Sequence, residues 1–218
     1  MTSWFEKNYL WIICCFLSLY LGISFLAPIA MHFGWTDIGD LIYKIYSPFC
    51  HQLAFRSWFL FGLQAYYPRQ LVEVNMVSYE QITGDTARNF EFARSFAGNE
   101  IMGYKVALCQ RDISIYGSLL FIGFLFQMTG KKIKSIPWWI WIVIGLVPIA
   151  IDGITQFGGL GIHLFSFLPN RESTPLLRTI TGTLFGSTTG LFLFPLLEET
   201  MVLSNREKNL RPESPKQE

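Results

Sequence analysis

Residues 9–31 include no charged side chain, and this feature constrains the fold more than any other part of the sequence. A helix needs about 20 apolar residues to cross the roughly 30 Å hydrocarbon core of a membrane. No water reaches that core, so the backbone N–H and C=O groups must be bonded within the segment, as they are in a helix. The run is longer than the roughly 7–15 apolar residues of a signal peptide, and no small-x-small cleavage site follows it. We therefore predict an uncleaved membrane-spanning helix.

Three further apolar stretches are long enough, or nearly so, to cross a membrane: residues 113–128, 136–151 and 175–197. Residues 136–151 open with a group of tryptophans, which are enriched at the headgroup boundary. The last stretch starts with the capping hydroxyl groups of Ser173 and Thr174 and with Pro175 at the first helical position. Charged residues make up only 15% of the chain, against about 25% in soluble domains. We predict an all-α, polytopic membrane helix bundle of about four transmembrane helices, with residues 1–204 as a single membrane domain.

The connection between the second and third stretches predicts the orientation. Lys131, Lys132 and Lys134 lie there without an acidic residue, and short positively charged loops stay on the cytoplasmic side. Counting outward, we expect both termini in the cytoplasm, together with a polar tail at residues 205–218. Residues 34–112 are then an extracytoplasmic cap, and the chain is a multi-pass protein of the cell membrane.

Within this cap the sequence predicts only short elements. A short helix and then an aromatic-rich interfacial stretch are expected in residues 37–61. Residues 71–81 favour a strand or an extended loop. Residues 86–96 have Phe and Ala at helical spacing with charged residues between them, which favours a small amphipathic helix.

Cysteine and histidine occur in two clusters that the predicted topology brings to the outer face. Cys50 and His51 are adjacent, and Cys109 and Asp112 directly precede the second apolar stretch. Thiolate, imidazole and carboxylate groups are ligands of zinc and other transition metals. We predict a metal site built from Cys50, His51, Cys109 and Asp112, with zinc or another transition metal as the cofactor. The spacing leaves two alternatives open: a Cys50–Cys109 disulfide, which an extracytoplasmic location permits, and free buried thiols.

More polar residues lie near the outer ends of the predicted spans. Asp152 and Gln156 share a helix face with Pro148, which loosens the backbone. Arg178 lies one turn inside the last span, where a cation opposes the positive end of the helix dipole. We expect it to pair with Asp152 or Asp112, and a lipid phosphate is the alternative. The side chains expected around the metal, or in contact with an anion, are Arg56, Arg111, Asp152, Gln156, Arg171 and Arg178.

The last stretch also contains a strip of small residues. Gly182, Gly186 and Gly190 repeat every four residues, which lets another helix approach closely. We expect this strip to pack against a span of the same chain.

Several short motifs occur in a fixed order along the chain: Cys50-His51-Gln52 with Arg56-Ser57, Cys109-x-Arg111-Asp112 with Ile115-Tyr116, Asp152-Gly153-x-Thr155-Gln156, Arg171-x-Ser173 and Arg178-x-x-Thr181-Gly182. Together they resemble a family of small prokaryotic membrane proteins called domain of unknown function 2085. The resemblance implies a fold and a membrane location, but no activity. Many members of that family resemble a Cys-x-Arg-Cys form where this chain has Asp112. A third cysteine implies a metal rather than a simple disulfide, and Asp112 can serve as an oxygen ligand in its place.

These features favour a binding or catalytic site at the outer membrane interface. A metal-activated water acting on a lipid headgroup is a reaction that such groups support. The expected contacts are the lipid bilayer, a lipid headgroup or a partner membrane protein. A net charge of +1 without a basic stripe argues against nucleic acid. The alternative is a disulfide-stapled membrane scaffold or accessory subunit without catalysis.

Overall fold

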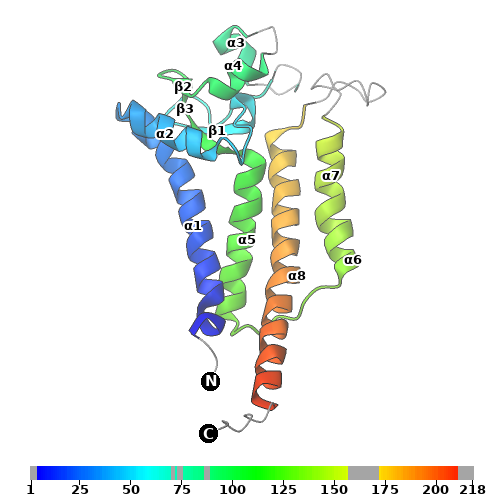
Figure 1. The fold of residues 1–218 in the computed structure, drawn as a ribbon. Coiled ribbons are helices and arrows are strands. Elements are labelled where there is room, and N and C mark those ends of the chain that lie inside the picture. Colours follow the sequence, from blue (N-terminus) through cyan, green and yellow to red (C-terminus); the bar gives the residue numbers. More distant parts are fainter. Residues whose placement is uncertain (1–3, 70–71, 73–75, 86–88, 157–171, 211–218) are drawn as a thin grey trace.

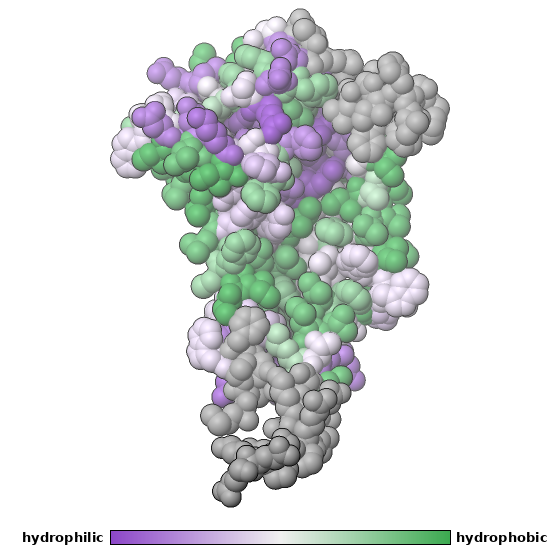
Figure 2. All heavy atoms as spheres, viewed as in Figure 1, coloured by the Kyte–Doolittle hydropathy of each residue, from purple (hydrophilic) through white to green (hydrophobic). Residues whose placement is uncertain are grey.

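A computed structural model describes residues 4–69, 72, 76–85, 89–156 and 172–210. Long helices stand side by side, and a smaller cap of short helices and strands covers one end of them (Figure 1). At the opposite end α1 begins, α8 ends and the chain connects α5 to α6 (Figure 1). In the view of Figure 2, hydrophobic side chains dominate the surface of the helices and hydrophilic side chains gather in the cap.

The helical part consists of α1 (Trp4–His32), α5 (Gln110–Met128), a segmented third helix and α8 (Pro175–Leu210). The third helix runs through α6 (Trp138–Ile140), the π-helical segment η2 (Trp141–Leu146) and α7 (Val147–Ile154). Pro148 has no N–H to donate, so it removes one helical hydrogen bond, and the π-helical segment lies directly before this proline-containing turn. The predicted N-terminal capping of helix α8 is confirmed, because the Thr174 hydroxyl oxygen accepts a hydrogen bond from the Leu177 N–H at 3.1 Å.

Two of the described helical stretches, Lys7–His32 and Pro175–Leu203, are long and apolar enough to cross a membrane. Trp138–Ile154 is apolar but shorter. Helix α5 has 19 residues but begins with the polar Gln110, Arg111 and Asp112. Each predicted stretch overlaps a helix, but α8 continues from the predicted end at 197 to Leu210. Of the described helices, only α1 and α8 meet the length and composition of a span.

The cap is formed by the chain between α1 and α5. Its helical elements are α2 (Thr36–Tyr46), η1 (Ala54–Arg56), α3 (Tyr79–Thr83) and α4 (Phe90–Ser95). Its strands are β1 (Ser57–Leu60), β2 (Gly98–Asn99) and β3 (Gly103–Cys109). The strands form an antiparallel sheet in the order β1–β3–β2. The prediction of an all-α chain is therefore wrong here, because the aromatic stretch after residue 57 pairs as β1 with a strand nearly 50 residues later.

Helix α2 is amphipathic and lies across the C-terminal end of α1 (Figure 1). Its buried side chains include Ile42, Tyr43 and Tyr46, and the Tyr43 hydroxyl donates to the Lys105 carbonyl of β3 at 2.6 Å. On its other face Ile38, Leu41 and Ile45 are exposed. A helix with such an apolar face is suited to lie in the membrane interface.

No loop separates the cap from the helices at β3. The strand ends at Cys109 and α5 begins at Gln110. The sheet therefore positions the first turn of α5 directly, and this turn is where the candidate site is assembled.

Candidate metal centre

The candidate metal ligands come from two places in the cap. Cys50 follows α2, and its N–H donates to the Tyr46 carbonyl at 3.1 Å, which closes one more turn after the helix. Gln52, two residues later, has a φ of 53°, a left-handed conformation that is uncommon for residues other than glycine. Such strained positions concentrate at functional sites. Cys109 ends β3, where it pairs with Ser57 of β1, and Asp112 lies in the first turn of α5.

The structure brings three of the four predicted ligands together. One ligand atom from each of Cys50, Cys109 and Asp112 lies within 4.8 Å of the other two. Both cysteines are free thiols. The Cys50 sulfur accepts hydrogen bonds from the N–H groups of Cys109, at 3.3 Å, and Gln52, at 3.5 Å. Backbone donors of this kind stabilise the charged form of the group that they contact.

His51 does not join this group. Its side chain is exposed, although the residue lines the same small cavity as the three ligands. Side chains of adjacent residues diverge, and at this turn the chain directs Cys50 inward. The sequence predicted that Cys50 and His51 are both ligands. In the structure only Cys50 of the two lies close to the ligand atoms of Cys109 and Asp112.

Neighbouring groups and burial control the ionisation of Cys50. They raise the pKa of its thiol, first through a hydrogen bond with the Cys109 side chain, then through burial, and further through the nearby Asp112 carboxylate. Without a cation the buried sulfur is therefore protonated. A bound metal ion would offset the same negative neighbours, and its binding would displace the thiol proton.

The three ligand residues line a cavity of about 160 Å³. This volume is larger than the roughly 30 Å³ that one water molecule occupies in the liquid. Most of the wall is polar and includes many of the residues that the sequence singled out. The lining residues are Phe49, Cys50, His51, Gln52, Leu53, Arg56, Cys109, Arg111, Asp112, Gln156 and Arg178.

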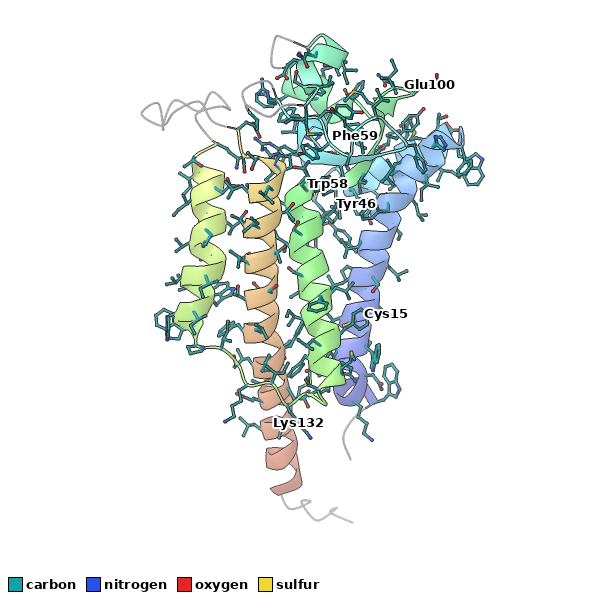
Figure 3. The ribbon with its side chains drawn as sticks, turned by 180° about the vertical axis from the view of Figure 1, so that it is seen from behind. Cys15, Tyr46, Trp58, Phe59, Glu100 and Lys132 are labelled. Atoms are coloured by element: carbon teal, nitrogen blue, oxygen red, sulfur yellow. The ribbon has the colours of Figure 1, made fainter. Side chains whose placement is uncertain are left out.

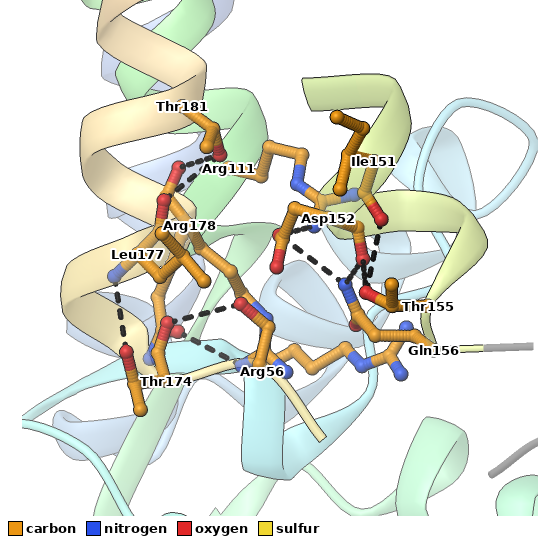
Figure 4. A network of polar contacts seen from close by, with 12 residues as sticks. Arg56, Arg111, Ile151, Asp152, Thr155, Gln156, Thr174, Leu177, Arg178 and Thr181 are labelled. Atoms are coloured by element: carbon orange, nitrogen blue, oxygen red, sulfur yellow. Dashed lines mark hydrogen bonds and ion pairs between the residues drawn. The ribbon is translucent and has the colours of Figure 1, made fainter. Parts of the chain in front are cut away.

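A network of ion pairs holds the arginines of this wall (Figure 4). Arg56 donates to both carboxylate oxygens of Glu172, at 2.7 and 3.0 Å. Arg178, whose side chain is 2% exposed, pairs with the same carboxylate and donates to the Gln110 side-chain oxygen at 3.3 Å. Glu172 therefore bridges the cap to α8.

A second ion pair joins Arg111 of α5 to the buried Asp152 of α7 (Figure 4). Gln156, one turn further along, donates to the Asp152 carbonyl at 2.6 Å and to its carboxylate at 3.2 Å. Among the described residues, Arg111 Nε, Arg178 Nε and one Asp152 carboxylate oxygen have no hydrogen-bond partner. These atoms are buried polar groups whose hydrogen-bonding capacity the described residues do not use.

One expectation about this network is wrong, and a second concerns a residue that the structure does not describe. Arg178 pairs with Glu172, and not with Asp152 or Asp112 as the sequence suggested. Arg171 lies outside the described residues. Glu172 itself was missed, although its place within the Arg171-x-Ser173 motif and one turn before Arg178 was a usable signal.

The glycine strip of α8 faces α5. A Cβ added at Gly186 would lie 2.2 Å from the Ile115 carbonyl oxygen, and one at Gly182 would lie 2.8 Å from the Arg111 carbonyl oxygen. At Gly190 it would meet Ile122 at 2.8 Å. The strip thus lets α8 approach the helix that bears Arg111 and Asp112.

Sequence reasoning also missed Lys105, which is 1% exposed in β3. Its ammonium group donates to the carbonyls of Gln52, at 2.8 Å, and Arg94, at 2.5 Å. Burial lowers the pKa of Lys105 to about 7. The Lys105 side chain therefore links the strained Gln52 backbone to β3 through a hydrogen bond.

Comparison with known proteins agrees with this picture of a membrane protein. A family described as predicted membrane protein (DUF2085) matches residues 91–192. An uncharacterized protein of Methanocaldococcus jannaschii is 30% identical over 201 residues, which cover 89% of this chain and 95% of that relative. No solved structure matches the chain. The chain therefore belongs to the DUF2085 family of predicted membrane proteins.

Proposed function

We propose that this membrane protein binds a zinc-like divalent metal ion through Cys50, Cys109 and Asp112. The observation that carries the proposal is the approach of the three ligand atoms to within 4.8 Å of one another at the wall of a polar cavity. Two thiolates and a carboxylate suit zinc. Three protein ligands leave one coordination position for water or a ligand, as catalytic rather than purely structural zinc sites do.

The surroundings support a metal in a second way. Two backbone N–H groups donate to the Cys50 sulfur, and metal-bound cysteines are held by such outer contacts. The cavity adds the guanidinium groups of Arg111 and Arg178 beside the ligands. If the site is catalytic, the metal lowers the pKa of a bound water and the arginines hold a negatively charged reactant.

The proposed site is on the extracytoplasmic side. α1, α5, α6–α7 and α8 each cross the bilayer, which places residues 34–112 outside and both termini, with the tail at 205–218, in the cytoplasm. The support is the lysine-rich connection after α5 and the large apolar side chains exposed along the two shorter helices, among them Phe121 (65%) and Val143 (57%). At about 1.5 Å per residue, the 19 residues of α5 extend about 28 Å.

Two positions at opposite ends of the molecule test this orientation. Glu100 lies in the cap and Lys132 in the connection after α5 (Figure 3), and both are exposed. A membrane-impermeant maleimide should label Glu100→Cys in intact cells and Lys132→Cys only after permeabilisation. Labelling of Lys132→Cys in intact cells would reverse the topology. The parent chain supplies the background from the native thiols.

Elemental analysis of protein purified in mild detergent without a chelator tests the metal. We expect about one equivalent of zinc or a related metal in the parent chain and its loss in Cys50→Ser and Asp112→Asn. Cys15→Ser is the matched control, because Cys15 is exposed on α1, far from the cap (Figure 3). Equal metal contents in Cys50→Ser and Cys15→Ser would refute the site.

The proximity of Cys50 and Cys109 also supports a second candidate, a disulfide-stapled scaffold. An oxidised pair would contain no metal, and its two thiols would react with a maleimide only after reduction. The same purified sample distinguishes the two functions by its metal content and its reactive thiol count.

A further inference from the structure

The polar cavity at the candidate metal ligands and an apolar groove between α1, α2 and α5 share one lining residue. Phe49 lines both, and it belongs to the turn that leads from α2 to Cys50. We propose that one lipid with an anionic phosphate headgroup binds across them, with its headgroup in the cavity and an acyl chain in the groove.

The groove has the size and the chemistry for a lipid chain. Its volume is about 600 Å³, within the range of about 300–1,000 Å³ of small-molecule sites. α1, α2 and the outer part of α5 form its walls, and several of its side chains are exposed, among them Phe16 (66%), Leu19 (64%) and Phe49 (70%). The lining residues are Phe16, Leu17, Leu19, Tyr20, Ile23, Ile45, Tyr46, Phe49 and Tyr116.

Residues of helix α5 line both the polar cavity and the apolar groove. Asp112 lines the polar cavity, and Tyr116, one helical turn further into the membrane, lines the groove. The Tyr116 ring packs against Tyr20 of α1 in an edge-to-face contact, with ring centroids 5.0 Å apart. A molecule that lies along this face of α5 would therefore meet charged side chains first, then aromatic and finally aliphatic ones. A lipid has the matching order of groups, from its charged headgroup to its acyl chain.

The polar end is built for an anion. Arg56, Arg111 and Arg178 all line the cavity. Glu172 and Asp152 hold these side chains in place, yet each guanidinium has several donors in a fixed fork, and Nε of Arg111 and of Arg178 has no partner among the described residues. Arginine forks match the oxygens of phosphate groups in geometry and charge. Arginines already fixed by ion pairs lose little side-chain entropy when an anion binds.

The polar cavity and the apolar groove together identify the class of ligand better than either does alone. Free phosphate would fill the cavity but leave the groove unused. An uncharged lipid would leave the arginines without an anion, and a zwitterionic lipid would bring a cationic group towards them together with its phosphate. The proposal does not require the metal. The three candidate metal ligands line the same cavity as the arginines, but the arginines and the groove residues are the groups that would contact the lipid.

Binding of phosphatidic acid to the full-length protein in detergent, followed by native mass spectrometry after chelator treatment, tests the proposal. We expect one tightly bound phosphatidic acid per chain and binding of phosphatidylcholine weaker by roughly tenfold or more, because its phosphate diester has one fewer free oxygen for the arginines and they repel its ammonium group. Inorganic phosphate should compete only at far higher concentration, since it makes no groove contact.

Two variants with matched controls test the polar cavity and the apolar groove one at a time. Leu19→Trp fills the groove and should weaken phosphatidic acid binding by roughly tenfold, whereas Leu26→Trp alters an exposed leucine of the same helix outside the groove and should not. Arg56→Gln should weaken binding similarly. Arg69→Gln is its control, because Arg69 also pairs with a glutamate (Glu80) and also lies over the Phe55 ring, but away from the cavity.

Several outcomes would overturn the proposal. These are equal binding of the two lipids, equal effects of Leu19→Trp and Leu26→Trp, or full competition by inorganic phosphate at lipid-like concentrations. Because the assay uses chelated protein, its result does not depend on whether zinc is found. Leu19 is exposed, so folding of that variant is not at risk even if Arg56→Gln proves unstable.

Discussion

The backbone N–H of Cys109 donates a hydrogen bond to the Cys50 sulfur at 3.3 Å, across 59 residues of sequence. This bond joins the turn after α2 to the end of β3. It holds one candidate ligand against the backbone of the other, while both sulfurs remain free. The two thiols are therefore close enough to share a cation or to be oxidised to a disulfide.

Oxidation should distinguish these two states. Metal-free protein treated with diamide should form a Cys50–Cys109 disulfide, because the ligand atoms lie within 4.8 Å, and stoichiometric zinc should protect the pair because its thiolates are then coordinated. Peptide mass spectrometry quantifies the cross-linked peptide. In the Asp112→Asn variant zinc should protect less, and full protection there would exclude Asp112 as a ligand.

Removal of the Glu172 carboxylate should destabilise the protein strongly. Glu172→Gln leaves the buried Arg178 without its counter-ion, and breaking a buried pair costs about 3–5 kcal/mol. The thermal midpoint in detergent should fall clearly, as measured by size-exclusion chromatography after heating. Glu198→Gln is the control, because its pair with Lys131 is partly exposed and should contribute less than about 1 kcal/mol. Equal losses in the two variants would show that Glu172 does not have this role.

The contact between α8 and α5 can be tested by adding one methyl group. In Gly186→Ala the new Cβ would lie 2.2 Å from the Ile115 carbonyl oxygen, so the helices must move apart, at a cost of about 1–3 kcal/mol. In Gly117→Ala the Cβ meets nothing within 4 Å, and helix propensity favours alanine by about 1 kcal/mol. Opposite shifts of the thermal midpoint are therefore expected. A neutral Gly186→Ala would contradict the close approach.

The stability of the cap should depend on pH through Lys105. Its folded pKa of about 7 lies below the ordinary value of 10.5 because the side chain is buried. Between these values the unfolded chain binds a proton that the folded chain lacks, so stability rises with pH, by roughly 1 kcal/mol per unit, and levels off below pH 7. Lys105→Met should remove this dependence.

The measurement is best made between pH 7 and 9, as the urea midpoint at each pH. The groups that face the Lys105 ammonium are the Tyr43 ring, the Cys50 thiol and Arg94. The pKa values of Tyr43 and Cys50 are raised, chiefly by burial for Tyr43 and by a hydrogen bond with the Cys109 side chain for Cys50, so neither ionises in the folded chain in this range. In the unfolded chain the Cys50 thiol ionises near its ordinary value of 9.0, which reduces the slope at the upper end of the range. A slope that persists in Lys105→Met would assign the effect to another group.

The long helices could be located from the sequence because a long apolar run is a local signal. Residues 9–31 lie within α1 and residues 175–197 within α8. The sheet could not be predicted in this way. β2 has only two residues, and β3 contains the charged Lys105 at a buried position, so no alternation of apolar and polar residues marks either strand.

The candidate site was predictable in its residue types but not in its pairings. Cys50, Cys109 and Asp112 stand out as ligand types, yet His51 does too, and only the turn after α2 separates its side chain from the others. The Arg56–Glu172 pair spans 116 residues, and no spacing rule reaches that far. The loss of hydration at a buried arginine predicts that a carboxylate must be near, but not which one.

The uninterrupted passage from β3 into α5 has a mechanical consequence. Helices that cross a bilayer change their tilt when its thickness changes. α5 cannot tilt without turning the last residue of β3, Cys109, to which it is joined directly, whereas Cys50 is anchored to α2 at the surface. If α5 crosses the bilayer as proposed above, the separation of the two sulfurs should therefore change with the thickness of the surrounding membrane.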